Sequence, residues 1–169
     1  MEYQVNKPYP KVEVEKENKE YAYLLLEDYA GVISEDTAIH QYSYQHFDQF
    51  NIDTEFSEAL SRIAMTEMKH LNLLGKTIKL LGVDPKFIFV EKNENCPKYW
   101  KSNFVNYTTN LKAMLIDDIK IEKEAIKAYQ KHIQMIDDRY IKQLLERIIE
   151  DEEQHIKCFN ELLERCKND

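Results

Sequence analysis

Two short motifs constrain this sequence more than any other feature. A glutamate precedes a histidine by three residues at Glu67–His70 and again at Glu152–His155. Both motifs lie in long stretches whose apolar residues recur with the period of an α-helix. A spacing of three places the carboxylate and the imidazole on one helix face, one turn apart. Leu, Ile and Phe fill the rest of those faces, so both pairs are predicted to point into an apolar core. Charged groups are rarely buried there unless they are paired or bound to something.

Four stretches of this amphipathic kind follow one another along the chain. They are predicted to be helices over about residues 20–50, 54–81, 107–136 and 138–167. The short links near residues 51–53 and 137 predict antiparallel neighbours. The link over residues 83–106 is long enough to recross the bundle and leave the second and third helices parallel. The sequence therefore predicts an all-α fold, a four-helix bundle with one long crossover between helices two and three.

The remaining segments give three further expectations. Residues 1–19 contain Pro8 and Pro10 and are predicted to be an N-terminal extension. This extension is expected to lie along the surface or to reach a partner subunit. Residues 20–169 are predicted to form one domain. Gly31 falls inside the first predicted helix, at a cost of roughly 1 kcal/mol relative to alanine. The apolar run 87–90 in the crossover is expected either to pair as a strand or to pack as a coil.

Two more glutamates, Glu35 and Glu122, lie on the apolar stripes of the first and third predicted helices. The midpoints of the four helices fall at about residues 35, 68, 121 and 152, which places all four glutamates at one level of the bundle. Four buried carboxylates with two neutral imidazoles carry a charge that the core does not tolerate, and two divalent cations would neutralise it. Oxygen-rich sites completed by imidazole suit iron or manganese better than zinc. The alternative is that these side chains lie on solvated helix faces.

Two further residues are candidates for catalytic roles beside the ligands. Asp118 lies one turn before the third-helix glutamate and is expected to accept the outer N–H of a ligand histidine. Tyr42 lies two turns after the first-helix glutamate and is expected to hydrogen-bond a ligand carboxylate or to give up an electron. For both, the alternative is an ordinary buried hydrogen-bond partner. His40, His46 and His132 have no glutamate at the required spacing and are interpreted as surface or structural histidines.

These motifs together resemble those of bacterioferritins. The segments 35–42 (EDTAIHQY), 67–70 (EMKH), 118–122 (DIKIE) and 151–155 (DEEQH) look like their first-, second-, third- and fourth-helix motifs. The resemblance covers about residues 20–167 and identifies a ferritin-like di-iron carboxylate protein of the bacterioferritin and rubrerythrin superfamily. It implies that one metal is bound by Glu35 and His70 and the other by Glu122 and His155, with Glu67 and Glu152 bridging.

The resemblance also implies an activity. A centre of two iron ions, with manganese as the other candidate, would react with dioxygen or hydrogen peroxide as a ferroxidase or peroxidase. An electron donor protein or ferrous iron would supply the electrons. Alternatives are an iron storage protein, a manganese catalase-like peroxide dismutase, and a binding module in which the metals only neutralise buried acids. Met68 occupies the place where bacterioferritins bind haem, but a lone methionine on a helix usually packs, so haem is not expected.

The sequence also departs from the relatives it resembles. It ends 14 residues after His155, whereas ferritins and bacterioferritins carry more residues that help to close a cage. Ile119 and Ala125 stand where rubrerythrins have an added glutamate, and no CxxC module is present. These departures favour a stand-alone ferritin-like domain, with a homodimer as the expected assembly.

Composition limits the other function classes. A net charge of −8 argues against a nucleic-acid binder. The 3 cysteines have no CxxC spacing, which favours a reducing compartment. No apolar run of about 18 residues and no signal peptide occur, so no membrane contact and a cytoplasmic location are expected.

Overall fold

Each α-helix of the computed structural model begins at a side chain that caps its free backbone N–H groups. The structure describes residues 2–90 and 96–166. Within them the α-helices are α1 (Lys19–Ala30), α2 (Glu35–Gln49), α3 (Thr54–Leu80), α4 (Leu111–Met135) and α5 (Arg139–Arg165). The capping side chains accept hydrogen bonds from the first turn and belong, in chain order, to Asn18, Ser34, Asp53, Asn110 and Asp138. Such caps satisfy backbone donors that have no partner inside the helix.

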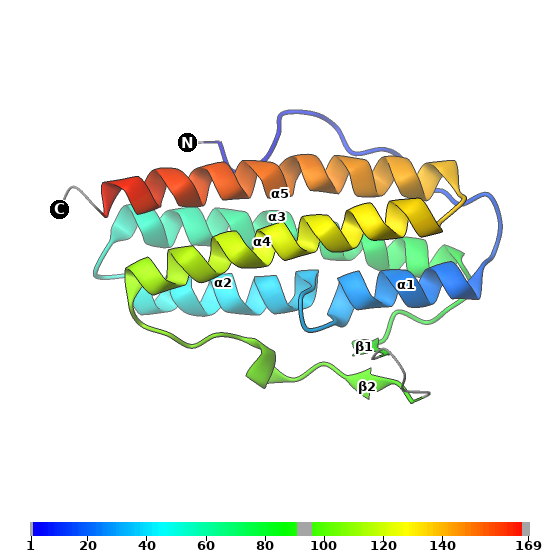
Figure 1. Ribbon diagram of the computed structural model, residues 1–169, viewed down its shortest axis with the longest axis horizontal. Helices are drawn as coiled ribbons and strands as arrows, with labels where there is room; N and C mark the ends of the chain where they lie inside the picture. Colours follow the sequence, from blue (N-terminus) through cyan, green and yellow to red (C-terminus); the bar gives the residue numbers. More distant parts are fainter. Residues whose placement is uncertain (1, 91–95, 167–169) are drawn as a thin grey trace.

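The helices form the predicted bundle. α1 and α2 follow one another along the same edge, and α3, α4 and α5 complete the four rows (Figure 1). α3 and α4 run in the same direction, because the segment between them crosses back along the bundle (Figure 1). In that crossover β1 (Ile88–Phe89) pairs antiparallel with β2 (Lys98–Tyr99), and a 3₁₀ turn follows at Ser102–Phe104. The all-α four-helix bundle with one long crossover is confirmed, and the apolar run forms a short strand.

The prediction of one continuous helix over residues 20–50 is wrong at residues 31–34. Gly31 does not lie inside a helix but ends α1, with its backbone N–H donating to the Glu27 carbonyl at 2.9 Å. The Ser34 hydroxyl donates to the Gly31 carbonyl at 2.8 Å and accepts from the Thr37 backbone N–H at 3.3 Å. This capping serine restarts the helix, because its side chain competes with the backbone ladder that a continuous helix would need. As a result Glu35 is the first residue of α2.

The apolar core has two parts with a polar layer between them. One cluster packs α1 against α3 and α5 and includes Leu26, Ile78 and Leu145. The other packs α2 and α3 against α4 and α5 and includes Leu60 and Phe159. Packed apolar side chains on both sides keep water away from the layer that separates them.

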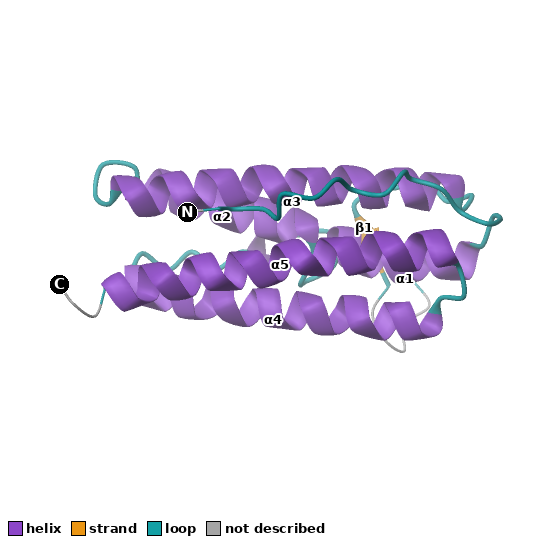
Figure 2. Ribbon diagram, turned by 90° about the horizontal axis from the view of Figure 1, so that it is seen from above, coloured by secondary structure: helices purple, strands orange, loops and turns teal. Residues whose placement is uncertain are grey.

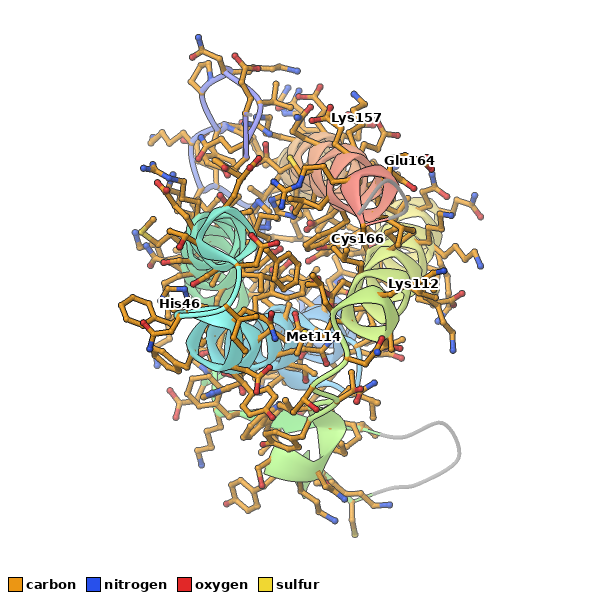
Figure 3. All side chains as sticks on the ribbon, turned by 90° about the vertical axis from the view of Figure 1, so that its left-hand side faces the viewer. His46, Lys112, Met114, Lys157, Glu164 and Cys166 are labelled. Carbon is orange, nitrogen blue, oxygen red and sulfur yellow. The ribbon has the colours of Figure 1, made fainter. Side chains whose placement is uncertain are left out.

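The N-terminal arm (residues 2–18) lies along the outside of α3 and α5, where two views place it (Figures 2 and 3). The crossover lies on the opposite side of the bundle (Figure 3). The arm ends beside the end of α3, where the Asn18 backbone N–H donates to the Leu81 carbonyl at 3.2 Å. There Gly82 has a φ of +88°, a conformation that favours glycine, and it stops α3. In the described part of the chain no helix is both long and apolar enough to cross a membrane.

Candidate metal centre

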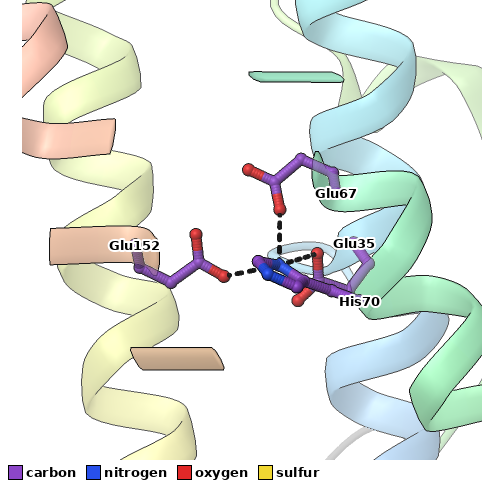
Figure 4. Close-up of side chains that lie close together, drawn as sticks. All are labelled: Glu35, Glu67, His70 and Glu152. Atoms are coloured by element: carbon purple, nitrogen blue, oxygen red, sulfur yellow. Dashed lines mark hydrogen bonds and ion pairs between the residues drawn. The ribbon is translucent and has the colours of Figure 1, made fainter. Parts of the chain in front are cut away.

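Four carboxylates and two imidazoles converge in the polar layer. They come from α2, α3, α4 and α5, and each of the six residues is at most 3% exposed. These residues, which we call the centre, are Glu35, Glu67, His70, Glu122, Glu152 and His155. Figure 4 shows four of them, with Glu35, Glu67 and Glu152 directed at one imidazole. The structure therefore brings together all six side chains that the sequence predicted as metal ligands.

Glu67 and Glu152 each face both histidines. Glu67 Oε2 lies 3.0 Å from His70 Nδ1, and its other oxygen lies 2.9 Å from His155 Nδ1. Glu152 Oε1 lies 3.2 Å from His70 Nδ1, and its Oε2 lies 2.9 Å from His155 Nδ1. A carboxylate that directs one oxygen to each of two imidazoles has the geometry of a bridging ligand.

Glu35 and Glu122 each face one histidine. Glu35 Oε2 lies 3.4 Å from His70 Nδ1, and Glu122 Oε1 lies 3.4 Å from His155 Nδ1. The ligand atoms form two groups of four, each group within 4.8 Å, and the groups share only the two bridging glutamates. Each group offers one imidazole nitrogen and three carboxylates, a hard donor set that suits iron or manganese.

The protein atoms alone do not satisfy this arrangement. Glu67 Oε1, Glu152 Oε2 and His155 Nδ1 are buried and make no hydrogen bond. Burial raises the pKa of the Glu35 carboxyl well above its usual range. Burial alone would lower the pKa of His70, but the carboxylates of Glu152 and Glu35 outweigh it and raise this pKa well above its usual value. Buried acids that lack enough donors are the environment that divalent cations stabilise, so the residues present fit a pair of metal ions.

Two buried tyrosines hold the outer carboxylates. The Tyr42 hydroxyl donates to Glu122 Oε1 at 2.7 Å, which is the contact with a carboxylate that the sequence predicts. The Tyr129 hydroxyl donates to Glu35 Oε1. Sequence analysis did not single out Tyr129, although it follows Glu122 by seven residues, as Tyr42 follows Glu35. This repeated spacing was the signal that could have identified it.

The outer nitrogens of the two histidines have different acceptors. His70 Nε2 lies 3.1 Å from Asp151 Oδ2, and His155 Nε2 lies 3.1 Å from the backbone carbonyl of Tyr3. The expectation that Asp118 accepts an outer histidine N–H is therefore wrong. Asp118 instead accepts hydrogen bonds from the side-chain amides of Gln41 and Gln45, at 2.8 and 3.0 Å. Sequence spacing favoured Asp118 because it lies on the stripe of a ligand, but the amide donors of α2 already occupy its Oδ1.

The other residues considered from the sequence lie outside the centre. His40 is half exposed and lies 3.5 Å from Asp36, while His46 hydrogen-bonds Ser57. His132 is buried against Asp28. These positions agree with their interpretation as surface or structural histidines.

Met68 is 51% exposed on the outside of α3. A cavity of about 10 Å³ lies beside the centre and is lined by residues that include Ile33, Ala125 and all four glutamates of the centre. That volume holds about one water-sized molecule.

Comparisons with known proteins agree with this architecture. A family model described as rubrerythrin matches residues 29–163. A probable manganese catalase of Clostridium acetobutylicum is 27% identical over 174 residues, which covers 94% of this chain and 76% of the relative. A bacterioferritin of Desulfovibrio desulfuricans is 28% identical over 138 residues, which covers 78% of this chain and 69% of the relative.

Solved structures give the same picture. KatB, a manganese catalase from Anabaena, has a TM-score of 0.84 at 25% identity, covering 98% of this chain and 81% of that chain. The D. desulfuricans bacterioferritin has a TM-score of 0.72 at 25% identity, covering 88% of this chain and 81% of that chain. The ferritin-like fold expected from the sequence is therefore confirmed.

Proposed function

This chain belongs to the rubrerythrin family of ferritin-like di-metal carboxylate proteins, and from that premise we propose that it disproportionates hydrogen peroxide at a pair of manganese ions. The reaction converts two molecules of peroxide into one of oxygen and two of water, and it needs no electron donor. The observation that carries the proposal is that Glu67 and Glu152 each direct one oxygen to each of two buried imidazoles. Such an arrangement would hold two cations close together.

The choice of manganese is supported by the extent of similarity. The manganese catalase relative covers 94% of this chain, and the bacterioferritin covers 78%. The structural match to the manganese catalase KatB also includes almost the whole chain, at a TM-score of 0.84. The donor set alone suits iron and manganese equally.

The residues of the chain would hold the ions and exclude bulk water. Glu35 and His70 would bind one ion and Glu122 and His155 the other, with the bridging glutamates shared. Tyr42 and Tyr129 would keep the outer carboxylates in position through their hydroxyl hydrogen bonds. When bound, the two ions would supply two electrons to one peroxide and recover two from a second.

The cavity beside the centre supports a small substrate. Its volume of about 10 Å³ holds about one molecule the size of water. The apolar clusters on both sides close the remaining approaches through the core.

The test is elemental analysis of protein purified without added metal, followed by measurement of oxygen release from peroxide. We expect two manganese ions per chain and one oxygen released for every two peroxides consumed. Glu152→Gln should lose both metal and activity, because it removes a ligand shared by the two ions. The control is Glu146→Gln, an exposed residue of the same helix, which should retain both. Absence of bound metal in the wild-type protein would refute the proposal.

A second candidate is a di-iron ferroxidase or peroxidase, supported by the 28% identity with a bacterioferritin. It predicts rapid oxidation of ferrous iron by dioxygen or peroxide, with no oxygen released from peroxide. Stopped-flow measurements on iron-loaded and manganese-loaded protein distinguish the two candidates. Homodimer formation and iron storage remain predictions that size-exclusion chromatography tests, since storage requires a large hollow particle.

A further inference from the structure

The N-terminal arm reaches the outer side of both candidate ligand histidines. Its Tyr3 carbonyl lies 3.1 Å from His155 Nε2. On the other side of the site, Asp151 Oδ2 lies 3.1 Å from His70 Nε2, and the arm holds this aspartate. A histidine that binds metal through Nδ1 must carry its proton on Nε2, so the acceptors at Nε2 determine the tautomer and the orientation of the ring.

Asp151 is fully buried, and the arm supplies two of its hydrogen-bond donors. The backbone N–H of Val5 donates to Oδ1 at 2.8 Å, and the Tyr9 hydroxyl donates to Oδ2 at 2.6 Å. Arg147 Nη1 lies 2.8 Å from Oδ1, and Nη2 of this arginine donates to the carbonyls of Val5 and Lys7 at 3.0 and 2.9 Å. The aspartate, the arginine and the arm therefore form one network that ends at His70.

The two halves of the bundle differ at the position that supplies this acid. Asp151 directly precedes the bridging Glu152, whereas the residue that directly precedes the bridging Glu67 is Thr66. The Thr66 hydroxyl donates to the Arg62 carbonyl of its own helix at 3.3 Å. His155 therefore has no aspartate equivalent to the one that faces His70, and the carbonyl of the arm takes that place.

The arm contacts the two halves at equivalent points. An arginine precedes each bridging glutamate by five residues, Arg62 in α3 and Arg147 in α5. Each guanidinium lies over the ring of an arm tyrosine, Arg62 over Tyr3 at 5.9 Å and Arg147 over Tyr9 at 4.5 Å. Further hydrogen bonds join the arm to α5 at the Glu2 carbonyl, which accepts from the Gln154 side chain at 2.8 Å.

We propose that residues 2–9 of the arm are positioning residues for the metal centre, and that they hold both ligand histidines with Nδ1 directed at the ions. The inference rests on the proposed function, since it concerns the same centre. Tyr3 acts through its backbone carbonyl, and Val5 and Tyr9 act through Asp151. Without the arm, His155 Nε2 loses its acceptor and the Asp151 that faces His70 loses two of its donors, so both rings gain freedom to turn or to exchange tautomer.

The test compares manganese affinity of the full chain, a chain lacking residues 2–9, and Tyr9→Phe. Competition with a chromophoric chelator measures each dissociation constant. Loss of groups that orient metal ligands typically weakens metal binding about 10- to 100-fold, so we expect a loss in that range for the deletion and about tenfold for Tyr9→Phe. The matched control is Tyr107→Phe, whose hydroxyl donates to the Ser102 carbonyl in the exposed crossover, and it should bind as the wild type does.

Nitrogen-15 spectra of the imidazoles in the zinc-loaded protein separate positioning from simple stabilisation. The wild type should show both Nε2 protons protected from exchange, and Tyr9→Phe should shift the signals of His70 but leave those of His155 in place. Where the deleted chain folds, a peptide of residues 2–10 added in trans should restore manganese affinity.

Unchanged manganese affinity and unchanged imidazole signals in Tyr9→Phe would overturn the inference, as would a deletion that lowers only thermal stability. If the deleted chain does not fold, Tyr9→Phe decides the matter alone. A wild-type protein that binds neither manganese nor zinc would refute the proposed function instead, so the two failures are distinguishable.

Discussion

Replacement of His132 by glutamine should remove a pH-dependent part of the stability. His132 is buried near the end of α4, with Nδ1 2.7 Å from Asp28 Oδ2 and Nε2 3.7 Å from Glu27 Oε2. Burial alone would lower the pKa of His132, but the hydrogen bond to Asp28 and the nearby carboxylate of Glu27 outweigh burial and raise the pKa to about 9. The charged form of this histidine is therefore the one that the folded protein favours.

The pKa difference gives the magnitude. An unfolded histidine has a pKa of about 6.5, so a difference of about 2.5 at about 1.4 kcal/mol per unit sets a ceiling of about 3 kcal/mol. Glu27 is half exposed, and solvent screens its share, so about 2 kcal/mol is the better expectation. The folded pKa lies above the unfolded one. The contribution is therefore fully present below pH 6.5 and is lost as the pH rises through about 9.

Urea unfolding of metal-free protein between about pH 6 and 10 measures this effect. The difference in unfolding free energy between wild type and His132→Gln should shrink by about 2 kcal/mol over that range. The control is Lys131→Gln, which removes a positive charge from an exposed neighbour on the same helix and should show no such trend. A difference that stays constant with pH would show that His132 is not charged in the folded protein, and the reasoning would be refuted.

Three further predictions concern single residues. Glu67→Gln should reduce bound metal below one ion per chain, because this residue faces both sites, whereas Glu35→Gln should leave about one ion. Elemental analysis measures both, and more metal in Glu67→Gln than in Glu35→Gln would contradict the bridging role. Tyr129→Phe removes a donor to a buried carboxylate and should lower the free energy of unfolding of metal-free protein, measured in urea, by about 1–2 kcal/mol. Equal stability would mean that this hydrogen bond contributes nothing. Gly82→Ala forces a side chain into a φ of +88° and should cost about 1 kcal/mol, seen as a melting temperature lower by about 2–4 °C; an unchanged melting temperature would contradict the strain.

Helical periodicity was sufficient to predict the bundle, because the apolar stripes in each segment must face a common core. The same stripes identified the six candidate ligands, because glutamate and histidine stand out among apolar residues on a face that must be buried. The break at residues 31–34 was not predicted. The break arises because the Ser34 hydroxyl forms hydrogen bonds with nearby backbone groups in place of the helical ones. The spacing of apolar residues carries no information about such hydrogen bonds.

The acceptors around the histidines were the least predictable part. Asp118 and Asp151 both lie near ligand positions in the sequence, and only the packing of the arm shows which one faces an imidazole. The acceptor for His155 is a backbone carbonyl, which every residue possesses and which no side-chain pattern reveals. Tyr129 differs, because its spacing from Glu122 repeats that of Tyr42 from Glu35 and was visible in the sequence.

The hydrogen bonds between the arm and α5 join positions that are 140 to 156 residues apart in the chain. During translation the arm leaves the ribosome before any of the helices, yet its partners in α5 are among the last to emerge. Contacts of such long range form late, because the intervening chain must be ordered first. Docking of the arm on α5 is therefore expected to follow assembly of the helices that carry the four carboxylates.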